Sequence, residues 1–301
     1  MYKDFKDLKN NVKTSEKTIV VAAAHETHTL EAVSSAVKEL GIKYLLVGDR
    51  NKIISLSSEI GFTPDNDCII DSSNDDECAA KAIGLIREGS GNALMKGIVE
   101  TGILLKAVLD KNHGIRDSKT LSHMALLEVP GYHKLIGITD GGMIPNPVFD
   151  QKIDIVKNAV SFFHRIRYKC PKVAVLCASE SVNPKIPETV DASKLQELNI
   201  NREFGESGEF GKCILEGPLS FDIAINKVSA ETKGFKSKIS GDTDILIVPN
   251  ITVGNVLAKG LIYWANAKMA GCILGAKTPI ILTSRGASTE EKHLSILLSL
   301  I

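Results

Sequence analysis

The sequence lacks the patterns by which several common protein classes are recognised. No hydrophobic run approaches the roughly 18 residues that a membrane-spanning helix needs, and the N-terminal segment MYKDFKDLKNNVKTSEK is charged throughout. Lysine plus arginine (36) equals aspartate plus glutamate (36), and neither sign forms a long block. We therefore expect a cytoplasmic protein that has neither a membrane nor a nucleic acid as its partner.

Motifs for metals and nucleotides are missing as well. The six cysteines have no C-x-x-C spacing and no neighbouring histidine pair, so they are expected to be reduced and structural, with no metal site. No G-x-G-x-x-G follows the first apolar run, which argues against a nicotinamide cofactor. The segment GESGEFGKC, from Gly205, departs from a Walker A loop in spacing and has Cys213 where a magnesium-binding Ser or Thr belongs.

The chain does contain a regular alternation of short apolar runs and amphipathic stretches. TIVVAAA, YLLVGD and NALMKG are each followed by a helical pattern, and several of these patterns end in glycine, as at Gly41. This β-α-β-α order, with 44% hydrophobic residues in 301, predicts two doubly wound α/β domains, and the glycines and polar residues of the loop between them favour a ligand cleft there. A Gly/Pro-rich loop at 136–147 precedes a long helical pattern from Phe149 through Arg167.

The predicted domain ranges follow from this loop and from the last elements. The final strand and helix are too few to stand alone, so we expect them to return to the first domain. The prediction is a discontinuous first domain of residues 1–140 and 278–301, and a second domain of residues 141–277. In the second domain, VNPKIPETVDA (182–192) is predicted to be a loop before the helix SKLQELN.

The segment GCILGAKTPIILTSRGASTEE contains the most informative pattern. The apolar run 279–282 predicts a strand buried on both faces, and Ser284 and Arg285 follow at its carboxyl end, where open α/β sheets bind ligands. Ser288 and Glu291 have the spacing of a helix capping box. Two interpretations stay open: Arg285 holds an anion or makes a structural salt bridge, and Glu291 takes part in chemistry or only caps the helix.

Other candidate site residues are polar groups at the ends of predicted elements. Each has a structural alternative, such as an ordinary exposed lysine or a histidine in the core. Ser122 and His123 stand at the start of a predicted strand, whereas a site at the carboxyl edge of the sheet needs residues at the end of a strand. His28, beside the first helix, is expected to be a cap or surface residue. The candidates are Lys96, Ser122, His123, Asp140, Asn146, Ser179 and Asp222.

Taken together, a set of linked motifs resembles the phosphate acetyl/butyryltransferase family, and its butyryltransferase branch most closely. The motifs include LMKGIVET, SHMALLEVPGY, ITDGGM, CASESVNPKIPETVDA, EGPLSFDIAI and the segment from GDTDILIVPNITVGN to TSRGAS, and they cover about residues 90–301. The resemblance implies an isocitrate/isopropylmalate dehydrogenase-like fold, homodimers or higher homo-oligomers, and a reaction between acyl-CoA and inorganic phosphate that uses no metal or other cofactor.

The resemblance also implies roles for particular residues. A serine-arginine pair and a following carboxylate act near the CoA thiol in the related acetyltransferases, and they match Ser284, Arg285 and Glu291. The carboxylate there is aspartate, so adjacent Glu290 is an alternative base. Lys106 stands where the family commonly has arginine and lacks the two-pronged grip of a guanidinium. Asn255, in the matching segment ITVGN, joins the substrate-binding candidates.

The function implied by the resemblance is transfer of a short-chain acyl group, butanoyl before acetyl, between CoA and phosphate. Two alternatives remain. A decarboxylating dehydrogenase of the same general fold needs acidic metal ligands and a nicotinamide site. The second alternative is a regulatory module that binds acyl-CoA without turnover. It stays open because Glu291 and Lys106 stand where the family has aspartate and arginine with roles in the reaction.

Overall fold

The structure, a computed structural model, describes residues 1–200, 209–283 and 287–301. Its contacts divide the chain into two compact units. Unit 1 comprises Met1–Asp7 and Ser122–Lys268, and unit 2 comprises Leu8–Leu121 and Met269–Ile301. The domain ranges predicted from the sequence place the boundaries at other residues and stay a prediction.

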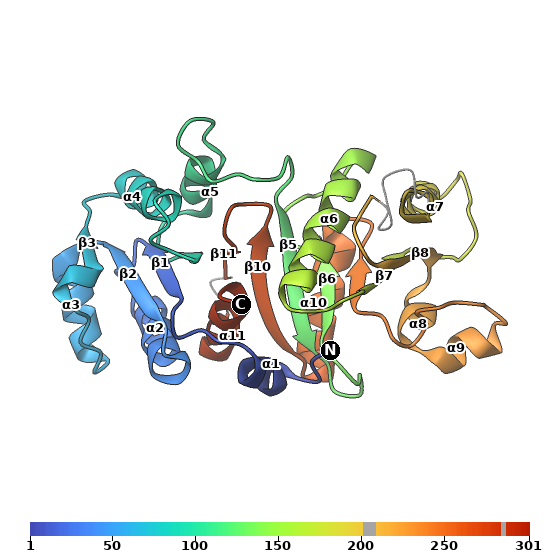
Figure 1. Ribbon diagram of the computed structural model, residues 1–301, viewed down its shortest axis with the longest axis horizontal. Helices are drawn as coiled ribbons and strands as arrows, with labels where there is room; N and C mark the ends of the chain where they lie inside the picture. Colours follow the sequence, from blue (N-terminus) through green and yellow to red (C-terminus); the bar gives the residue numbers. More distant parts are fainter. Residues whose placement is uncertain (201–208, 284–286) are drawn as a thin grey trace. The chain divides into compact units, whose positions relative to one another are not determined.

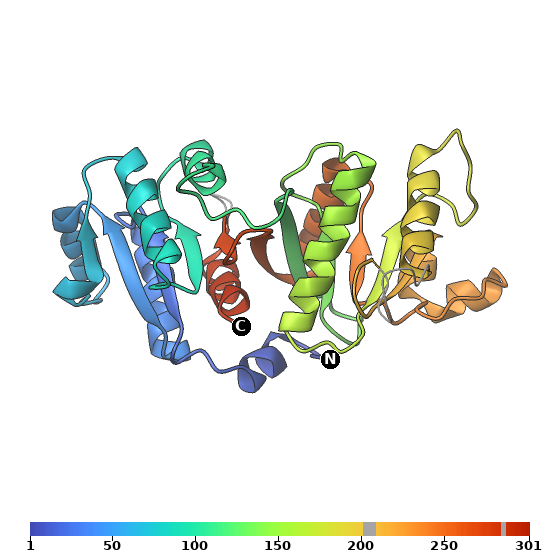
Figure 2. The same ribbon diagram turned by 45° about the horizontal axis from the view of Figure 1, so that its top comes forward.

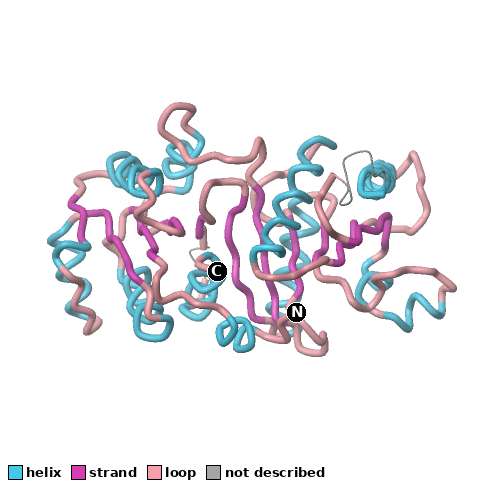
Figure 3. The backbone as a smooth tube through the Cα atoms, in the orientation of Figure 1, coloured by secondary structure: helices cyan, strands magenta, loops and turns pink. Residues whose placement is uncertain are grey.

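Unit 2 alternates strands and helices along its first part, as the apolar periodicity predicts, and the alternation can be followed in Figure 3. A short helix, α1 (Phe5–Asn11), precedes it. The elements of unit 2 are β1 (Thr18–Ala22), α2 (Thr27–Leu40), β2 (Lys43–Gly48), α3 (Arg50–Glu59), β3 (Ile69–Asp71), α4 (Asp75–Arg87), β4 (Ala93–Lys96), α5 (Thr101–Leu109), β10 (Lys268–Leu274), β11 (Ile280–Ile281) and α11 (Thr289–Ser299).

The strands of unit 2 are ordered β3-β2-β1-β4-β11-β10. β1 is parallel to β2 and β4, and β11 is parallel to β4, so the carboxyl ends of these strands share one edge (Figure 1). The chain runs outward from β1 to β3 and then returns to the other side of β1 as β4. The order therefore reverses between β1 and β4, and such a switch point is where ligands bind in open α/β sheets.

Helices cover both faces of this sheet (Figure 2). Right-handed crossovers that run in opposite directions along the sheet place α2 and α3 on one face and α4 on the other. α2 ends at Gly41, whose φ of 64° suits the left-handed C-cap that the sequence predicts. Ile19, Leu30 and Leu46, each fully buried, join α11 residues such as Leu297 in one apolar core.

Unit 1 contains the remaining described elements, and its strands are ordered β5-β6-β9-β7-β8. β9 is parallel to both β6 and β7, and β7 is parallel to β8. The elements are β5 (Ser122–Glu128), β6 (Ile136–Thr139), α6 (Phe149–Arg165), β7 (Lys172–Leu176), α7 (Pro187–Ile200), β8 (Ile214–Leu219), α8 (Phe221–Ile225), α9 (Lys227–Thr232), β9 (Ile245–Ile247) and α10 (Ile251–Ala265).

Two local expectations in unit 1 need correction. The segment 182–192 is not wholly a loop, because α7 begins at Pro187. Proline suits the first helical turn, since its φ is already helical and its missing N–H has no partner to lose there. In addition, β5 is antiparallel to β6. The start of β5, with Ser122 and His123, therefore lies at the same edge as the carboxyl end of β6, and not at the wrong end.

Candidate functional site

A small pocket of about 180 Å³ lies at the switch point of unit 2. Its walls come from the segments after the carboxyl ends of β1, β4 and β11, together with one residue of α11. The lining residues are Glu26, His28, Thr29, Lys96, Gly97, Ile98, Thr283 and Lys292. Of the residues predicted from sequence, Lys96 is in this pocket. Glu26 and Lys292 were missed, because nothing in the sequence indicates that they meet.

The carboxylate of Glu26 caps helix α2 from this pocket. It accepts hydrogen bonds from the backbone N–H groups of Thr29, at 2.8 Å, and His28, at 3.2 Å. Burial alone would raise the pKa of Glu26, but the Thr29 hydroxyl, these N–H groups and the charge of Lys292 together lower it. Glu26 is therefore ionised, while His28 is exposed as the sequence analysis expects.

Lys96 is held in a fixed position at the end of β4. Its ammonium donates hydrogen bonds to the carbonyl oxygens of Gly97, at 3.0 Å, and Val99, at 3.1 Å. Gly97 is itself confined, because an added Cβ would lie 2.1 Å from the carbonyl oxygen of Ala23. The turn after β4 therefore holds the ammonium of Lys96 at the pocket wall.

Ser284 and Arg285 lie outside the described residues, but the helix that follows them is described. The hydroxyl of Ser288 accepts a hydrogen bond from the N–H of Glu291, at 3.1 Å, as the cap predicts. Burial raises the pKa of the Glu291 carboxyl, and the charge of Lys292 only partly offsets this. Glu290, the alternative base, is exposed. A half-buried carboxyl with a raised pKa has the properties of a general base.

Lys106 lies in a different pocket from Lys96. It is an exposed residue of α5 and lines a cavity of about 480 Å³ between α4 and α5, whose walls also include Arg87, Asp110 and His113. Both cavities belong to unit 2. Lys96 and Lys106, both candidate site residues from the sequence, therefore line separate pockets.

In unit 1, Asp140 organises the loop after β6. Its Oδ1 accepts hydrogen bonds from the N–H groups of Gly142 and Met143, both at 2.9 Å, and its Oδ2 accepts one from Ile144 at 3.0 Å. The N–H of His123 also donates to Oδ1, at 3.2 Å. Asp140 is 2% exposed, so its carboxylate is committed to shaping the turn.

His123 and Ser122 differ in how their polar atoms are satisfied. Ser122 is fully buried and accepts a hydrogen bond from the Asn158 amide at 3.0 Å. The Nδ1 atom of His123 is buried and has no hydrogen-bond partner among the residues described. Burial lowers the pKa of His123, although the charge of Asp140 opposes the shift, so the imidazole is neutral. The backbone of Gly142 packs against this ring.

The remaining predicted residues are distributed over unit 1. Asn255 is exposed, and its amide lies 3.5 Å from the carbonyl oxygen of Gly141. Asn146 is exposed in the following turn. Among the residues that the structure describes, the hydroxyl of Ser179 bonds only to the backbone of Ser181, whereas Asp222 forms an ion pair with Lys233 at 2.9 Å. The structure thus groups Asn255 with the Asp140 loop, while Asp222 belongs to a surface ion pair.

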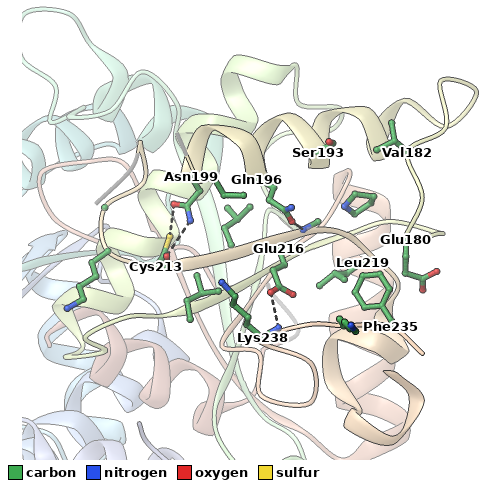
Figure 4. A pocket seen from close by; sticks show the side chains of 18 residues that line it. Glu180, Val182, Ser193, Gln196, Asn199, Cys213, Glu216, Leu219, Phe235 and Lys238 are labelled. Atoms are coloured by element: carbon green, nitrogen blue, oxygen red, sulfur yellow. Dashed lines mark hydrogen bonds between the residues drawn. The ribbon is translucent and has the colours of Figure 1, made fainter. Parts of the chain in front are cut away.

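A larger cavity of about 740 Å³ borders β8 and α7 and contains none of the predicted site residues (Figure 4). Its polar groups already pair with one another. The Asn199 amide donates to the carbonyl oxygen of Cys213 at 3.3 Å, and Glu216 accepts from the N–H of Lys238 at 2.9 Å. Burial raises the pKa of Cys213 to about 12, so its thiol is not a nucleophile at neutral pH.

Within residues 1–200, 209–283 and 287–301, no group of three or more His, Cys, Asp or Glu side chains is placed to hold a metal ion. No helix in the same ranges combines the length and apolarity required to span a bilayer.

Comparison with known proteins identifies the family. The family model described as phosphate acetyl/butaryl transferase matches residues 73–300. The chain is 38% identical to phosphate butyryltransferase of Clostridium acetobutylicum over 300 residues, which cover 99% of this chain and 98% of that protein. It is 36% identical to phosphate acetyltransferase of Thermotoga maritima over 285 residues, which cover 95% of each chain.

Solved structures agree with these relatives. A branched-chain phosphotransacylase from Enterococcus faecalis superposes with a TM-score of 0.81 at 32% identity, over 94% of this chain and 98% of that one. A putative 4-hydroxythreonine-4-phosphate dehydrogenase from Salmonella typhimurium has a TM-score of 0.54 at 12% identity, covering 95% of this chain and 99% of the other, and it supports the dehydrogenase-like α/β fold alone. The chain therefore belongs to the phosphate acetyl/butaryl transferase family.

Proposed function

We propose that this phosphate acyltransferase catalyses the reaction butanoyl-CoA + phosphate = butanoyl phosphate + CoA. The observation that carries the proposal is the 38% identity to a phosphate butyryltransferase over almost the whole of both chains. Acetyl-CoA is the second candidate donor, supported by the 36% identity to a phosphate acetyltransferase. The names of these two relatives differ only in the acyl group that is transferred.

The chemistry asks the protein to hold a weak nucleophile against a thioester. An oxygen of phosphate attacks the carbonyl carbon, the C–S bond breaks, and the CoA thiolate leaves and takes up a proton. Orientation of two bound reactants lowers such a barrier by about 7–11 kcal/mol in favourable cases. Lys96 and Arg285 are proposed as the cations that hold phosphate, and Lys106, which lines a separate pocket, is proposed as a further substrate-binding residue. The reaction as proposed uses no metal and no cofactor other than its substrates.

Ser284, Arg285 and Glu291 are proposed to act on the developing charges. Ser284 and Arg285 would donate hydrogen bonds to the thioester oxygen and the departing thiolate. In the reverse direction Glu291 would take the proton from the CoA thiol, and the raised pKa of its half-buried carboxyl supports this role. The proposed substrate-binding residues remain Ser122, His123, Asp140, Asn146, Ser179, Asp222 and Asn255.

The experiment is to measure release of CoA from acetyl-, butanoyl- and valeryl-CoA with a thiol reagent, with and without phosphate and in the presence of a chelator. We expect release that requires phosphate, persists with chelator and is fastest with butanoyl-CoA. Fastest release from acetyl-CoA would favour the second candidate. Binding of acyl-CoA without any release would instead support a regulatory module, and NAD(P)-dependent turnover would support a dehydrogenase.

We also propose that the protein works as a homodimer in the cytoplasm. An apolar stripe on α10 supports the dimer: Val253, Val256, Tyr263 and Trp264 are 40%, 66%, 76% and 91% exposed and lie within about 100° of one helix face. The only charged residue of α10 is Lys259. A second copy would bury this stripe in a two-fold contact.

Light scattering with size-exclusion chromatography tests the dimer. Val256→Glu would place a carboxylate in the proposed contact and should give a monomer. Val228→Glu, at a position on α9 with the same 66% exposure, is the matched control and should leave a dimer. A wild-type monomer, or dimers from both variants, would contradict the assignment to α10.

A further inference from the structure

Lys292 is a buried lysine that points into the small pocket at the switch point of unit 2. The residue is 8% exposed and belongs to α11, whose first turn also carries Glu291. The pocket it lines is built from the ends of β1, β4 and β11. Most of this side chain is thus buried, and it reaches the edge of the sheet where a parallel α/β unit binds ligands.

Among the described residues, the ammonium of Lys292 has electrostatic interactions with Glu26 and Glu291 but no direct hydrogen bond or ion pair. Across residues 1–200, 209–283 and 287–301, no oxygen lies within ion-pair or hydrogen-bond distance of it. The contrast with Lys134 is direct, because Lys134 is 2% exposed and forms ion pairs of 2.6 Å with both Asp242 and Asp244. A buried charge is costly unless it is paired. Lys292 is balanced only by the more distant charges of Glu26 and Glu291, and an anion bound in the pocket would give its ammonium a direct partner.

The neighbouring groups leave the centre of the pocket to an anion. The carboxylate of Glu26 is taken up by the N–H groups of His28 and Thr29. Lys96 contributes a second cation, which is fixed on backbone carbonyl oxygens. The hydroxyl-bearing side chains of Thr29 and Thr283 complete the wall. Two ammonium groups and the Thr283 side chain line the pocket, against one carboxylate that already accepts hydrogen bonds from the Thr29 hydroxyl and two backbone N–H groups.

We propose that Lys292 is a binding residue for a phosphate oxyanion in this pocket, and that the anion is the inorganic phosphate that attacks the thioester. The inference rests on the proposed function and adds a residue that the sequence did not indicate. A phosphate group of CoA has the same chemistry. The pocket volume of about 180 Å³ favours inorganic phosphate, because it is below the roughly 300–1,000 Å³ of pockets that enclose larger ligands.

The test compares Lys292→Met with Lys52→Met, which removes the same charge from an exposed lysine of α3 in the same unit. Lys292→Met should raise the KM for phosphate about tenfold or more, the loss expected for one charge-assisted hydrogen bond, with the KM for acyl-CoA within about twofold of wild type. Its melting temperature should equal or exceed that of wild type, since methionine fills the space without a buried charge. Lys292→Arg should restore part of the phosphate affinity, and Lys52→Met should leave both KM values unchanged.

Three outcomes would overturn the inference. A higher KM for acyl-CoA with phosphate unaffected would assign Lys292 to a phosphate group of CoA. Unchanged KM values with a lower melting temperature would make Lys292 structural. The third outcome would come from calorimetric titration with inorganic phosphate in the absence of acyl-CoA. Equal phosphate affinity of wild type and Lys292→Met would show that Lys292 does not bind the anion. This titration also separates the two proposals. If the wild-type protein shows no phosphate-dependent release of CoA, the proposed function is refuted, and the binding of phosphate in the titration still decides the role of Lys292.

Discussion

The buried ion pair of Lys134 and Asp244 in unit 1 predicts a large loss of stability when one partner is neutralised. Both side chains are 2% exposed, and Lys134 Nζ lies 2.6 Å from Asp244 Oδ1. Asp244 Oδ2 accepts a second hydrogen bond, from the N–H of Lys172 at 2.8 Å. Asp244 lies directly before β9, the strand between β6 and β7, and Lys134 lies shortly before β6. Asp244→Asn keeps the shape of the side chain but removes the charge that balances Lys134.

The magnitude follows from what is left behind. Removing one partner of a buried pair costs about 3–5 kcal/mol, because the other charge remains buried. Asp242, which is also 2.6 Å from Lys134 but 34% exposed, still pairs with Lys134 in this variant and reduces the loss of free energy of unfolding. We therefore expect a loss of about 3 kcal/mol for Asp244→Asn. Asp242→Asn should cost less. Replacing both members, as Lys134→Met with Asp244→Asn, removes both buried charges and should recover about 2 kcal/mol relative to Asp244→Asn alone.

Urea unfolding followed by far-UV circular dichroism measures these differences, and hydrogen exchange of the β9 amides assigns the transition to unit 1. The linear dependence on urea gives the free energy of each variant. A loss below about 1 kcal/mol for Asp244→Asn, the size of an exposed pair, would refute the reasoning. So would a double variant that is no more stable than Asp244→Asn.

Three further outcomes are expected. Glu291→Gln should raise the melting temperature at pH 7, because a carboxyl whose pKa is raised by folding favours the folded state only while protonated and opposes it as pH rises through the folded pKa. The same variant should release CoA more slowly if Glu291 is the base. Melting curves check the first effect, and a pH-rate profile checks the second. Cys177 and Cys213, whose pKa values burial raises to about 12, should react with a disulfide reagent at pH 8 far more slowly in the folded protein than in urea; equal rates would contradict their burial. Gly254→Ala should destabilise by about 1–3 kcal/mol, since its Cβ would lie 2.7 Å from the Cα of Gly141, whereas Gly84→Ala in α4, with nothing within 4 Å, should stabilise by about 0.5–1 kcal/mol in the same urea assay.

The sequence alone predicted the alternation of strands and helices and the family. Apolar runs without alternation are typical of strands buried on both faces, which is why 18–22 and 93–96 were recognisable as strands. Local caps were equally readable: Gly41 ends α2, and Ser288 begins α11, as their residue types require. These features depend on neighbours within one or two turns, so the local sequence contains the information.

The sequence also named Lys96 as a residue at a strand end, where the structure places it in a pocket. It did not separate Lys96 from Lys106, because the two lie ten residues apart on different elements and only the packing of α4 on α5 gives Lys106 its own cavity. Nor did it exclude a role for Asp140 in binding, because the turn that occupies its carboxylate is visible only in three dimensions.

What tertiary structure decided was strand direction, strand order and burial. Ser122 and His123 came to the carboxyl edge of β6 because β5 runs antiparallel to it, which no periodicity reveals. Glu26 and Lys292, 266 residues apart, meet because the chain returns to place β11 beside β4. A hydrophobic pattern specifies which face of an element is buried, but not which distant element covers it. The proposed role of Lys292 depends on this packing, because only the tertiary structure brings its side chain to the pocket that Lys96 also lines.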